Sequence, residues 1–419
     1  MNNVKKRDYR AALLVFAIAC RAVAFGAGGS IVASTILAQP EPRPPAESPP
    51  PGNNIAMSAD DMARFLAGMP LPKVSPLAPL TNDPSWQAHS AFFEDAFAKL
   101  VQGKLAKFHL WQDANLPESK EPVPVAYYMF SGPDLLYLDQ FFPNASVYIM
   151  CGKEEIGPPP DPLRIVDLPG ALQNLENAMK SALTTTYFIT QDMKINLQEQ
   201  QLRGVLPILY VFLARADKTI REVTFVALDR DGAAHVSTRG RGGTPGVRID
   251  YIDNRSGREQ TVFYFTTDIS DGGIAANPAF MKFCDHYGIG VSFLKSSSYL
   301  MFENGFARIR NFILDHSWMI VQDDSGIPLA YFNPEKWNLR LFGIYAGPID
   351  LFKKYYQPKL QELYATTNPP EFGIGFGYQW DYTKSNLMVA QRSDAPSKAE
   401  KSGQANGRRR SWVSRFWPF

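Results

Sequence analysis

The chain has 419 residues, of which 45% are hydrophobic and 13% aromatic, and its formal net charge is +2. This composition supports a large packed core and excludes an intrinsically disordered protein. Residues 1–21 and residues 393–419 each carry a net charge of +4, so residues 22–392 carry −6. Because binding to nucleic acid requires clustered positive charge, we expect no nucleic-acid partner.

Residues 1–38 have the parts of an export signal. A cationic segment over 1–10 precedes an apolar segment over 11–20, and small apolar residues continue after Arg21. This order is typical of a cleaved signal peptide. An uncleaved membrane anchor over about 11–38 is the first alternative, and a lipoprotein signal at Cys20 is the second.

These three interpretations all predict an extracytoplasmic protein, periplasmic or secreted, with the membrane as a partner if the segment stays uncleaved. A cytoplasmic protein with a spurious start is the remaining alternative. After the signal, residues 40–51 hold seven prolines in twelve positions, which favours an extended, semi-rigid spacer. We therefore assign residues 39–84 to a proline-rich tether, in which Ser58 is expected to cap a short helix.

Residues 85–392 are expected to form a single α/β domain, and residues 393–419 a disordered basic tail. The domain begins with a helix capped by Asp83. Apolar runs over 123–130 and 145–152 flank a short helical segment, and this strand–helix–strand order is typical of a parallel sheet. Helices are predicted next over 169–188 and about 192–216. The second of these contains ten consecutive apolar residues, too few to span a membrane, which predicts a buried helix.

The pattern then changes to antiparallel hairpins over 222–270. Helices and strands alternate again afterwards, with helices predicted over 278–287, 305–316 and 348–365. Near the end, aromatic and apolar residues alternate with glycines from Phe372 to Trp380, which predicts a strand with a bare backbone face. Together these elements predict an α/β fold, namely a Rossmann-like mixed sheet, largely parallel, with an antiparallel hairpin extension and flanking helices.

Residues 131–154 carry a resemblance to a known family. The order of strand, glycine-containing turn, helix and strand resembles the first motif of Rossmann-type methyltransferases, and it implies a Rossmann-like arrangement. The segment departs from that motif in having Gly132 alone in the turn. It also has Gly152-Lys153 where an acidic residue would bind a ribose. The resemblance therefore extends to the arrangement of strands and not to the activity.

Small, polar and acidic residues follow several predicted strands. Ligands of open α/β sheets bind at the carboxyl ends of strands, so these residues are candidates for a binding crevice. The candidates are Ser131, Asp134, Lys295, Asp323, Asp324 and Ser325. The alternative is that they are only turn formers, with Asp134 capping a helix. If they form one site, Asp134 and Asp323 must lie on the same edge of the sheet.

The sequence contains no strong catalytic, metal or cofactor motif, and we expect neither a metal nor a cofactor. Ser292 and Lys295 spell the SxxK motif of penicillin-binding enzymes, but within a strand they would point to opposite faces. Asp323 or Asp324 could act with His316 as acid and base or hold a divalent cation. The remaining two cysteines, Cys151 and Cys284, are interpreted as buried free thiols, with a single disulfide as the alternative.

These observations favour an exported protein that binds a small molecule or an envelope partner at the strand-end crevice. An extracytoplasmic hydrolase that uses carboxylates of that crevice is the alternative. A cluster of two or more carboxylates in one pocket would favour the enzyme, whereas a pocket of aromatic side chains and backbone would favour binding.

Overall fold

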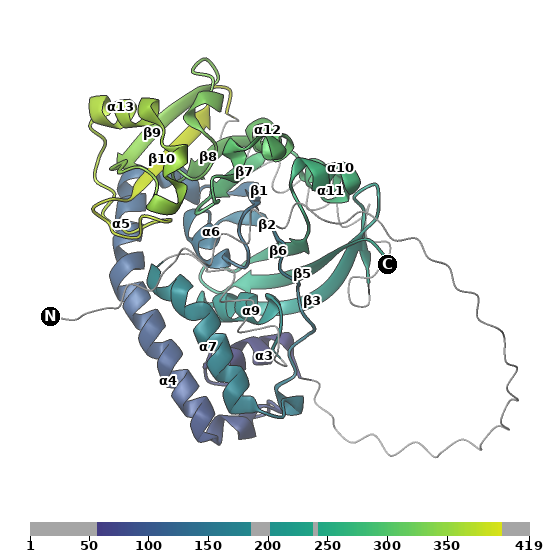
Figure 1. The fold of residues 1–419 in the computed structure, drawn as a ribbon. Helices are drawn as coiled ribbons and strands as arrows, with labels where there is room; N and C mark the ends of the chain where they lie inside the picture. The colour runs from purple at the N-terminus through teal and green to yellow at the C-terminus, as the bar shows by residue number, and fades with distance from the viewer. Residues whose placement is uncertain (1–56, 186–201, 238–241, 396–419) are drawn as a thin grey trace, which may run out of the picture. The chain divides into compact units, whose positions relative to one another are not determined.

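A ten-stranded mixed sheet runs through the described part of the chain, which comprises residues 57–185, 202–237 and 242–395 of a computed structural model (Figure 1). The strands are β1 (Val123–Tyr128), β2 (Ala145–Gly152), β3 (Lys218–Leu228), β4 (Ala234–Val236), β5 (Thr244–Asp253), β6 (Arg258–Thr266), β7 (Gly290–Leu294), β8 (Ser317–Gln322), β9 (Trp337–Gly343) and β10 (Asn386–Arg392).

The sheet has a parallel centre and antiparallel edges. Its strand order is β4-β3-β5-β6-β2-β1-β7-β8-β10-β9. The five strands from β6 to β8 are mutually parallel, whereas β3, β4 and β5 form an antiparallel extension and β10 runs antiparallel between β8 and β9. The central strands β1, β7 and β8 are buried at every position, as apolar strands covered on both faces are. The predicted α/β fold is confirmed.

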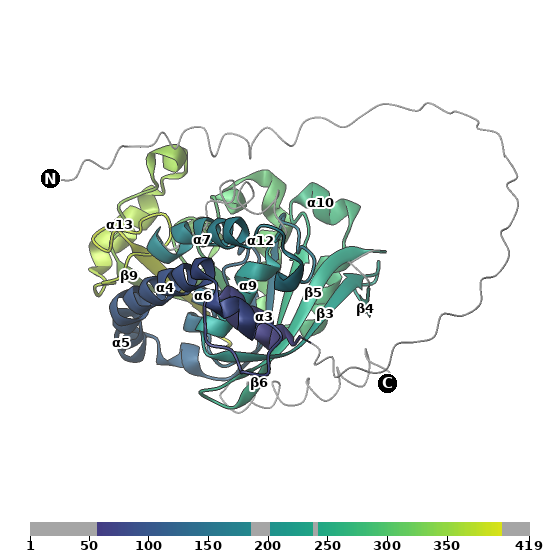
Figure 2. The ribbon, with the colours of Figure 1, turned by 90° about the horizontal axis from the view of Figure 1, so that it is seen from below.

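Helices cover both faces of the sheet (Figures 1 and 2). The first group is α3 (Ala59–Leu66), α4 (Pro84–Lys99), α5 (Ala106–Asn115), α6 (Leu135–Phe141), α7 (Leu168–Thr185) and α9 (Leu206–Arg215). The second group is α10 (Asp271–Ala276), α11 (Ala279–Tyr287), α12 (Ala307–His316) and α13 (Pro358–Thr367). Alternate residues of β1 contact the two groups: Ala126 and Tyr128 pack with the first, Val125 and Tyr127 with the second.

The packed unit begins before residue 85. Ser58 caps α3 by accepting a hydrogen bond from the Asp61 amide at 3.0 Å, as the sequence predicts. Phe65 and Leu66 of this helix are fully buried, and α3 packs against α9 and β3. Residues 57–84 therefore belong to the same packed unit as the predicted domain. The predicted export segment (1–38), residues 39–56 of the predicted tether and residues 396–419 of the predicted tail lie outside the described residues.

Two predicted elements differ from the structure. The helix expected over 348–365 is divided into a 3-10 helix (Asp350–Tyr355) and α13, because Pro358 starts a new helix at its first turn. The strand expected from Phe372 to Trp380 does not form; this segment is irregular, with one isolated bridge between Phe376 and Gln379. The last strand is β10 instead. The helix predicted over 169–188 is present as α7 as far as Thr185. The helix predicted over about 192–216 is present as the buried α9, which begins only at Leu206; residues 186–201 lie outside the described residues.

Candidate functional site

Asp134 and Lys295 form a buried ion pair at the carboxyl ends of two adjacent parallel strands. Asp134 follows β1, Lys295 follows β7, and the Lys295 Nζ lies 2.5 Å from the Asp134 Oδ2. Both side chains are at most 6% exposed. Burial lowers the pKa of Lys295, and the Asp134 carboxylate acts against that shift. Asp134 stands at the N-cap position of α6, but its side chain makes no capping hydrogen bond, so its partner is the lysine.

Tyrosines complete the surroundings of this ion pair. The Tyr128 hydroxyl lies 3.3 Å from both the Asp134 Oδ2, to which it donates, and the Lys295 carbonyl oxygen. The Lys295 Nζ also lies 3.9 Å from the centre of the Tyr137 ring, a cation–π distance. The Tyr137 hydroxyl is buried without a hydrogen-bond partner among the described residues.

Asp323 lies at the same edge of the sheet, after β8, which is parallel to β7. Its Oδ2 accepts a hydrogen bond from the Ser296 amide at 2.9 Å, and its Oδ1 accepts one from the Ser325 amide at 3.0 Å and another from the Ser325 hydroxyl. Burial and the neighbouring charge of Asp324 raise the pKa of Asp323 to about 7. This carboxyl is therefore set to exchange a proton near neutral pH.

Asp324 points to a different set of partners. It accepts hydrogen bonds from the Tyr299 hydroxyl at 2.6 Å and from the Asn386 side-chain amide at 3.0 Å. Burial raises its pKa as well. The two adjacent carboxyls thus share one buried region but accept hydrogen bonds from different donors.

Residues 295–299 form a turn that contacts both Asp323 and Asp324 and has an unusual backbone. Ser296, Ser298 and Tyr299 have φ values of 51°, 54° and 54°, a left-handed region that residues other than glycine rarely adopt. Such conformations cost about 1–3 kcal/mol each and cluster at functional sites. In addition, the Ser296 and Ser297 hydroxyls are buried without a hydrogen-bond partner among the described residues.

Residues 372–380 cover this turn. Gly377 has φ +61°, and a Cβ at that position would lie 1.9 Å from the Asp323 Oδ2. The hydroxyl of the next residue, Tyr378, lies 2.9 Å from the Ser296 carbonyl oxygen and 2.9 Å from the Ser298 hydroxyl. Gly377 therefore presents its bare backbone to the Asp323 carboxylate, although the segment is not a strand.

A second lysine lies near the buried pair. Lys104 belongs to a single π-helical turn (Leu100–Leu105) between α4 and α5, a feature frequent at functional sites. Burial and the nearby charge of Lys295 lower the pKa of Lys104 to about 8. Lys104 makes neither an ion pair nor a hydrogen bond with any residue that the structure describes. The sequence gives no signal for this residue, because it lies in a helix far from any strand end.

Ser131 belongs to the same turn as Asp134, whose amide donates to the Ser131 carbonyl oxygen at 3.2 Å, but its side chain faces β2. Its hydroxyl donates to the Cys151 carbonyl oxygen at 3.3 Å, beside β2. A Cβ at Gly152 would lie 3.5 Å from the Gly132 Cα and 2.3 Å from a carboxylate oxygen of Glu154. The turn after β1 is thus packed closely against the end of β2, and Glu154 supplies a buried carboxylate one residue beyond the Gly152-Lys153 pair.

Two other predicted pairings are not formed. His316 precedes β8, at the opposite end of the strand from Asp323, and its Nε2 contacts Asp285 at 3.1 Å. It therefore cannot act with Asp323 or Asp324. Ser292 lies inside β7 with its hydroxyl 2.7 Å from that of Ser317, so it does not meet Lys295.

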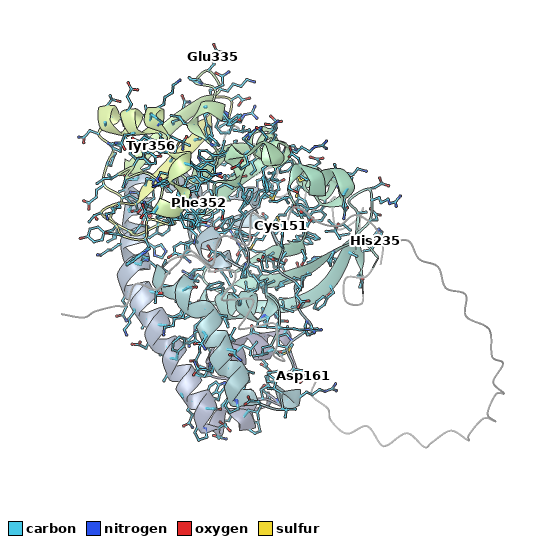
Figure 3. All side chains as sticks on the ribbon, in the orientation of Figure 1. Cys151, Asp161, His235, Glu335, Phe352 and Tyr356 are labelled. Atoms are coloured by element: carbon cyan, nitrogen blue, oxygen red, sulfur yellow. The ribbon has the colours of Figure 1, made fainter. Side chains whose placement is uncertain are left out.

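Cys151 and Cys284 are both buried free thiols, and the Cys151 side chain lies within the interior (Figure 3). Burial raises the pKa of both thiols, so neither is a reactive thiolate.

A further buried charged cluster lies at the amino edge of β6. The Lys218 Nζ contacts the Asp253 Oδ2 at 2.7 Å and the Asp139 Oδ1 at 3.0 Å. Lys218 therefore contacts two carboxylates, whereas Lys295 pairs with Asp134 and Lys104 forms no ion pair within the described part of the chain.

Within the described ranges, no three His, Cys, Asp or Glu side chains gather closely enough to hold a metal ion. In the same ranges, no helix combines the length and apolar character needed to cross a membrane. Comparison with known proteins gives no match among family models, curated proteins or solved structures.

Proposed function

We propose that the protein is an exported, extracytoplasmic binding protein with a Rossmann-like sheet, and that it binds a small anionic molecule at the carboxyl edge of β1 and β7. The observation that best supports this proposal is the order of the strands in the sheet. β10 is antiparallel to both β8 and β9, so β9 runs parallel to β8. The six parallel strands in chain order are β1, β2, β6, β7, β8 and β9. With β10 set aside, their order in the sheet is the third, second, first, fourth, fifth and sixth.

That order is the one of doubly wound nucleotide-binding folds, in which ligands occupy the crevice where the strand order reverses. Here the reversal falls between β1 and β7, the two strands that carry Asp134 and Lys295. The position of these residues therefore favours the interpretation as a binding site and not the alternative that they only form turns.

The charges support a ligand with a negative group. The charge of Lys295 lowers the pKa of Lys104. Lys295 is paired with Asp134, whereas Lys104 forms no ion pair with any residue that the structure describes. A bound carboxylate or phosphate would neutralise the second lysine. The unpartnered hydroxyls of Ser296 and Ser297 are further donors for its oxygens.

Access requires movement of residues 372–380. Gly373, Gly375 and Gly377 in this segment give its backbone the freedom to move. Tyr378 is the side chain whose two hydroxyl contacts would have to break.

The test uses thermal shift and calorimetry with inorganic phosphate, succinate and citrate as probes. We expect at least one probe to raise the melting temperature of the full chain, and Lys104→Met to abolish that rise. The matched control is Lys107→Met, an exposed lysine one turn further on, which should keep it. No response to any of these anions, or equal responses of the two variants, would refute the proposal.

A hydrolase is the second candidate, favoured by one observation. Asp323 has a pKa of about 7 beside a second carboxyl, and a general acid or base works best with a pKa near the operating pH. Hydrolysis of nitrophenyl esters and glycosides that is lost in Asp323→Asn, with anion binding intact, would support this function. Both carboxyl oxygens of Asp323 already accept hydrogen bonds from Ser296 and Ser325, which favours a positioning role in a binding site.

A further inference from the structure

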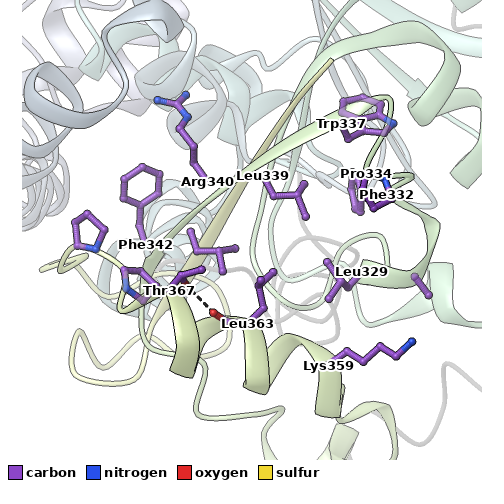
Figure 4. A pocket seen from close by; sticks show the side chains of 14 residues that line it. Leu329, Phe332, Pro334, Trp337, Leu339, Arg340, Phe342, Lys359, Leu363 and Thr367 are labelled. Carbon is purple, nitrogen blue, oxygen red and sulfur yellow. Dashed lines mark hydrogen bonds between the residues drawn. The ribbon is translucent and has the colours of Figure 1, made fainter. Parts of the chain in front are cut away.

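An apolar groove of about 710 Å³ lies between β9, α13 and the 3-10 helix Leu329–Tyr331 (Figure 4). Phe332, Trp337, Leu339 and Leu363 are among its lining side chains, and Figure 4 shows α13 along one side of it and β9 along the other. The groove is separate from the site at β1 and β7, and its lining is aromatic and aliphatic where that site is charged.

The groove opens along the free edge of β9. The four consecutive residues 339–342 all line it, although successive side chains of a strand point to opposite faces of a sheet. Side chains from both faces of the sheet can line one groove only if the groove passes around the edge of β9. β9 is the last strand of the sheet, and no strand that the structure describes lies on its other side.

The backbone of β9 offers hydrogen bonds on that edge. The Trp337 amide donates to the Asn333 carbonyl oxygen, and the Gly343 amide donates to that of Pro370, both away from β10. Because backbone groups of a strand alternate in direction, the amides of Leu339 and Leu341 point the same way. An unpaired apolar edge of this kind is a template for an added strand.

The chain itself leaves the described structure beside this groove. Arg392 pairs with Trp337, and the Ser393 amide donates to the Lys336 carbonyl oxygen at 3.0 Å. The 16 residues 396–411 are polar and basic, and the next eight, Trp-Val-Ser-Arg-Phe-Trp-Pro-Phe over 412–419, contain four aromatic residues. At about 3.3 Å per residue, 16 residues reach roughly 50 Å, more than twice the length of β9.

We propose that residues 412–419 bind in this groove as an extended segment added to the free edge of β9. Their aromatic side chains would cover the part of the apolar lining that is still accessible, including Leu339 and Leu363, which are only partly buried. Pro418 has no amide hydrogen, so it must point away from β9. The alternation of a strand then directs the amides of Val413, Arg415 and Trp417 toward β9.

Amide hydrogen exchange on the full chain tests this proposal. We expect exchange at Leu339 and Leu341 to become at least about tenfold faster when Trp412, Phe416, Trp417 and Phe419 are replaced by serine. The matched control replaces Arg408, Arg409 and Arg410 by serine, which changes the charge of the same tail and should leave exchange at β9 unchanged. All these substitutions lie beyond residue 395, so none of them changes a side chain of the described sheet or of the helices that cover it.

Two results would overturn the proposal. Equal exchange at Leu339 and Leu341 in the natural chain and the serine variant would mean that residues 412–419 do not cover the edge. Protection that appears only with a dimeric mass in light scattering, and disappears on dilution, would mean that a second copy occupies the groove. Protection in a monomer at all concentrations is the expected result.

Discussion

The Lys295 ammonium and the Asp134 carboxylate lie 2.5 Å apart, and neither is more than 6% exposed. A buried ion pair of this kind adds little to stability compared with apolar residues, but its separation leaves a buried charge without a partner. This asymmetry gives the first prediction. Lys295→Met should lower the free energy of unfolding by about 3–5 kcal/mol.

The double variant Lys295→Met with Asp134→Leu should lose less stability than Lys295→Met alone, because it removes both charges. Urea denaturation measures both effects, and Lys107→Met, at an exposed position, should stay within about 0.5 kcal/mol of the natural chain. A single variant as stable as the control would show that the pair is not buried as described.

The pH dependence of stability tests the state of Asp323. Its pKa is raised to about 7 by burial and by Asp324, whereas an aspartate of the unfolded chain has a pKa of about 3.9. Between these values the folded protein holds a proton that the unfolded chain has lost. The contribution of this group to the free energy of unfolding is therefore greatest below about pH 4 and decreases as the pH rises to about 7.

Asp323→Asn should reduce this fall between about pH 5 and pH 7.5, as measured by urea denaturation at several pH values. Asp381→Asn is the matched control, because hydrogen bonds from Thr383 lower the pKa of Asp381 and it titrates below this range. Equal slopes for the natural chain and Asp323→Asn would exclude a protonated Asp323.

Gly377 is the most restrictive position of the segment that covers the site. Gly377→Ala should destabilise the protein by at least about 1–2 kcal/mol, because the backbone is left-handed and the new Cβ would collide with the Asp323 carboxylate. Gly373→Ala is the control, since its φ is not positive and its nearest atom is the end of the Glu371 side chain at 3.7 Å. Thermal denaturation should separate the two variants; similar melting temperatures would contradict the described contact.

The proposed export of the protein is tested by topology reporters. A reporter enzyme that is active only outside the cytoplasm, fused after Pro51, should be active. The same fusion without residues 1–38 should be inactive. Activity only from a reporter that works in the cytoplasm would reject the extracytoplasmic assignment.

The sequence by itself determined most of the helices and strands, and the edge of the sheet at which the candidate residues stand. Apolar runs of strand length and helical periodicity arise from neighbours along the chain, and parallel strands bring the residues that follow them to one edge. Asp134, Lys295 and Asp323 could therefore be grouped before any partner was known. The Ser58 cap and the buried apolar helix α9 were predictable for the same local reason.

Only the tertiary structure decided the partners. The pairing of Asp134 with Lys295 depends on β7 lying beside β1, although more than 130 residues separate these strands, and His316 was excluded because it lies at the other end of β8. Lys104 approaches the site from a helical turn that has no sequence signal. The alternation from Phe372 to Trp380 predicted a strand, but this segment is irregular and packs against Asp323 and the turn over 295–299 instead. Such contacts join residues distant in the chain, so their energies leave no local pattern in the sequence.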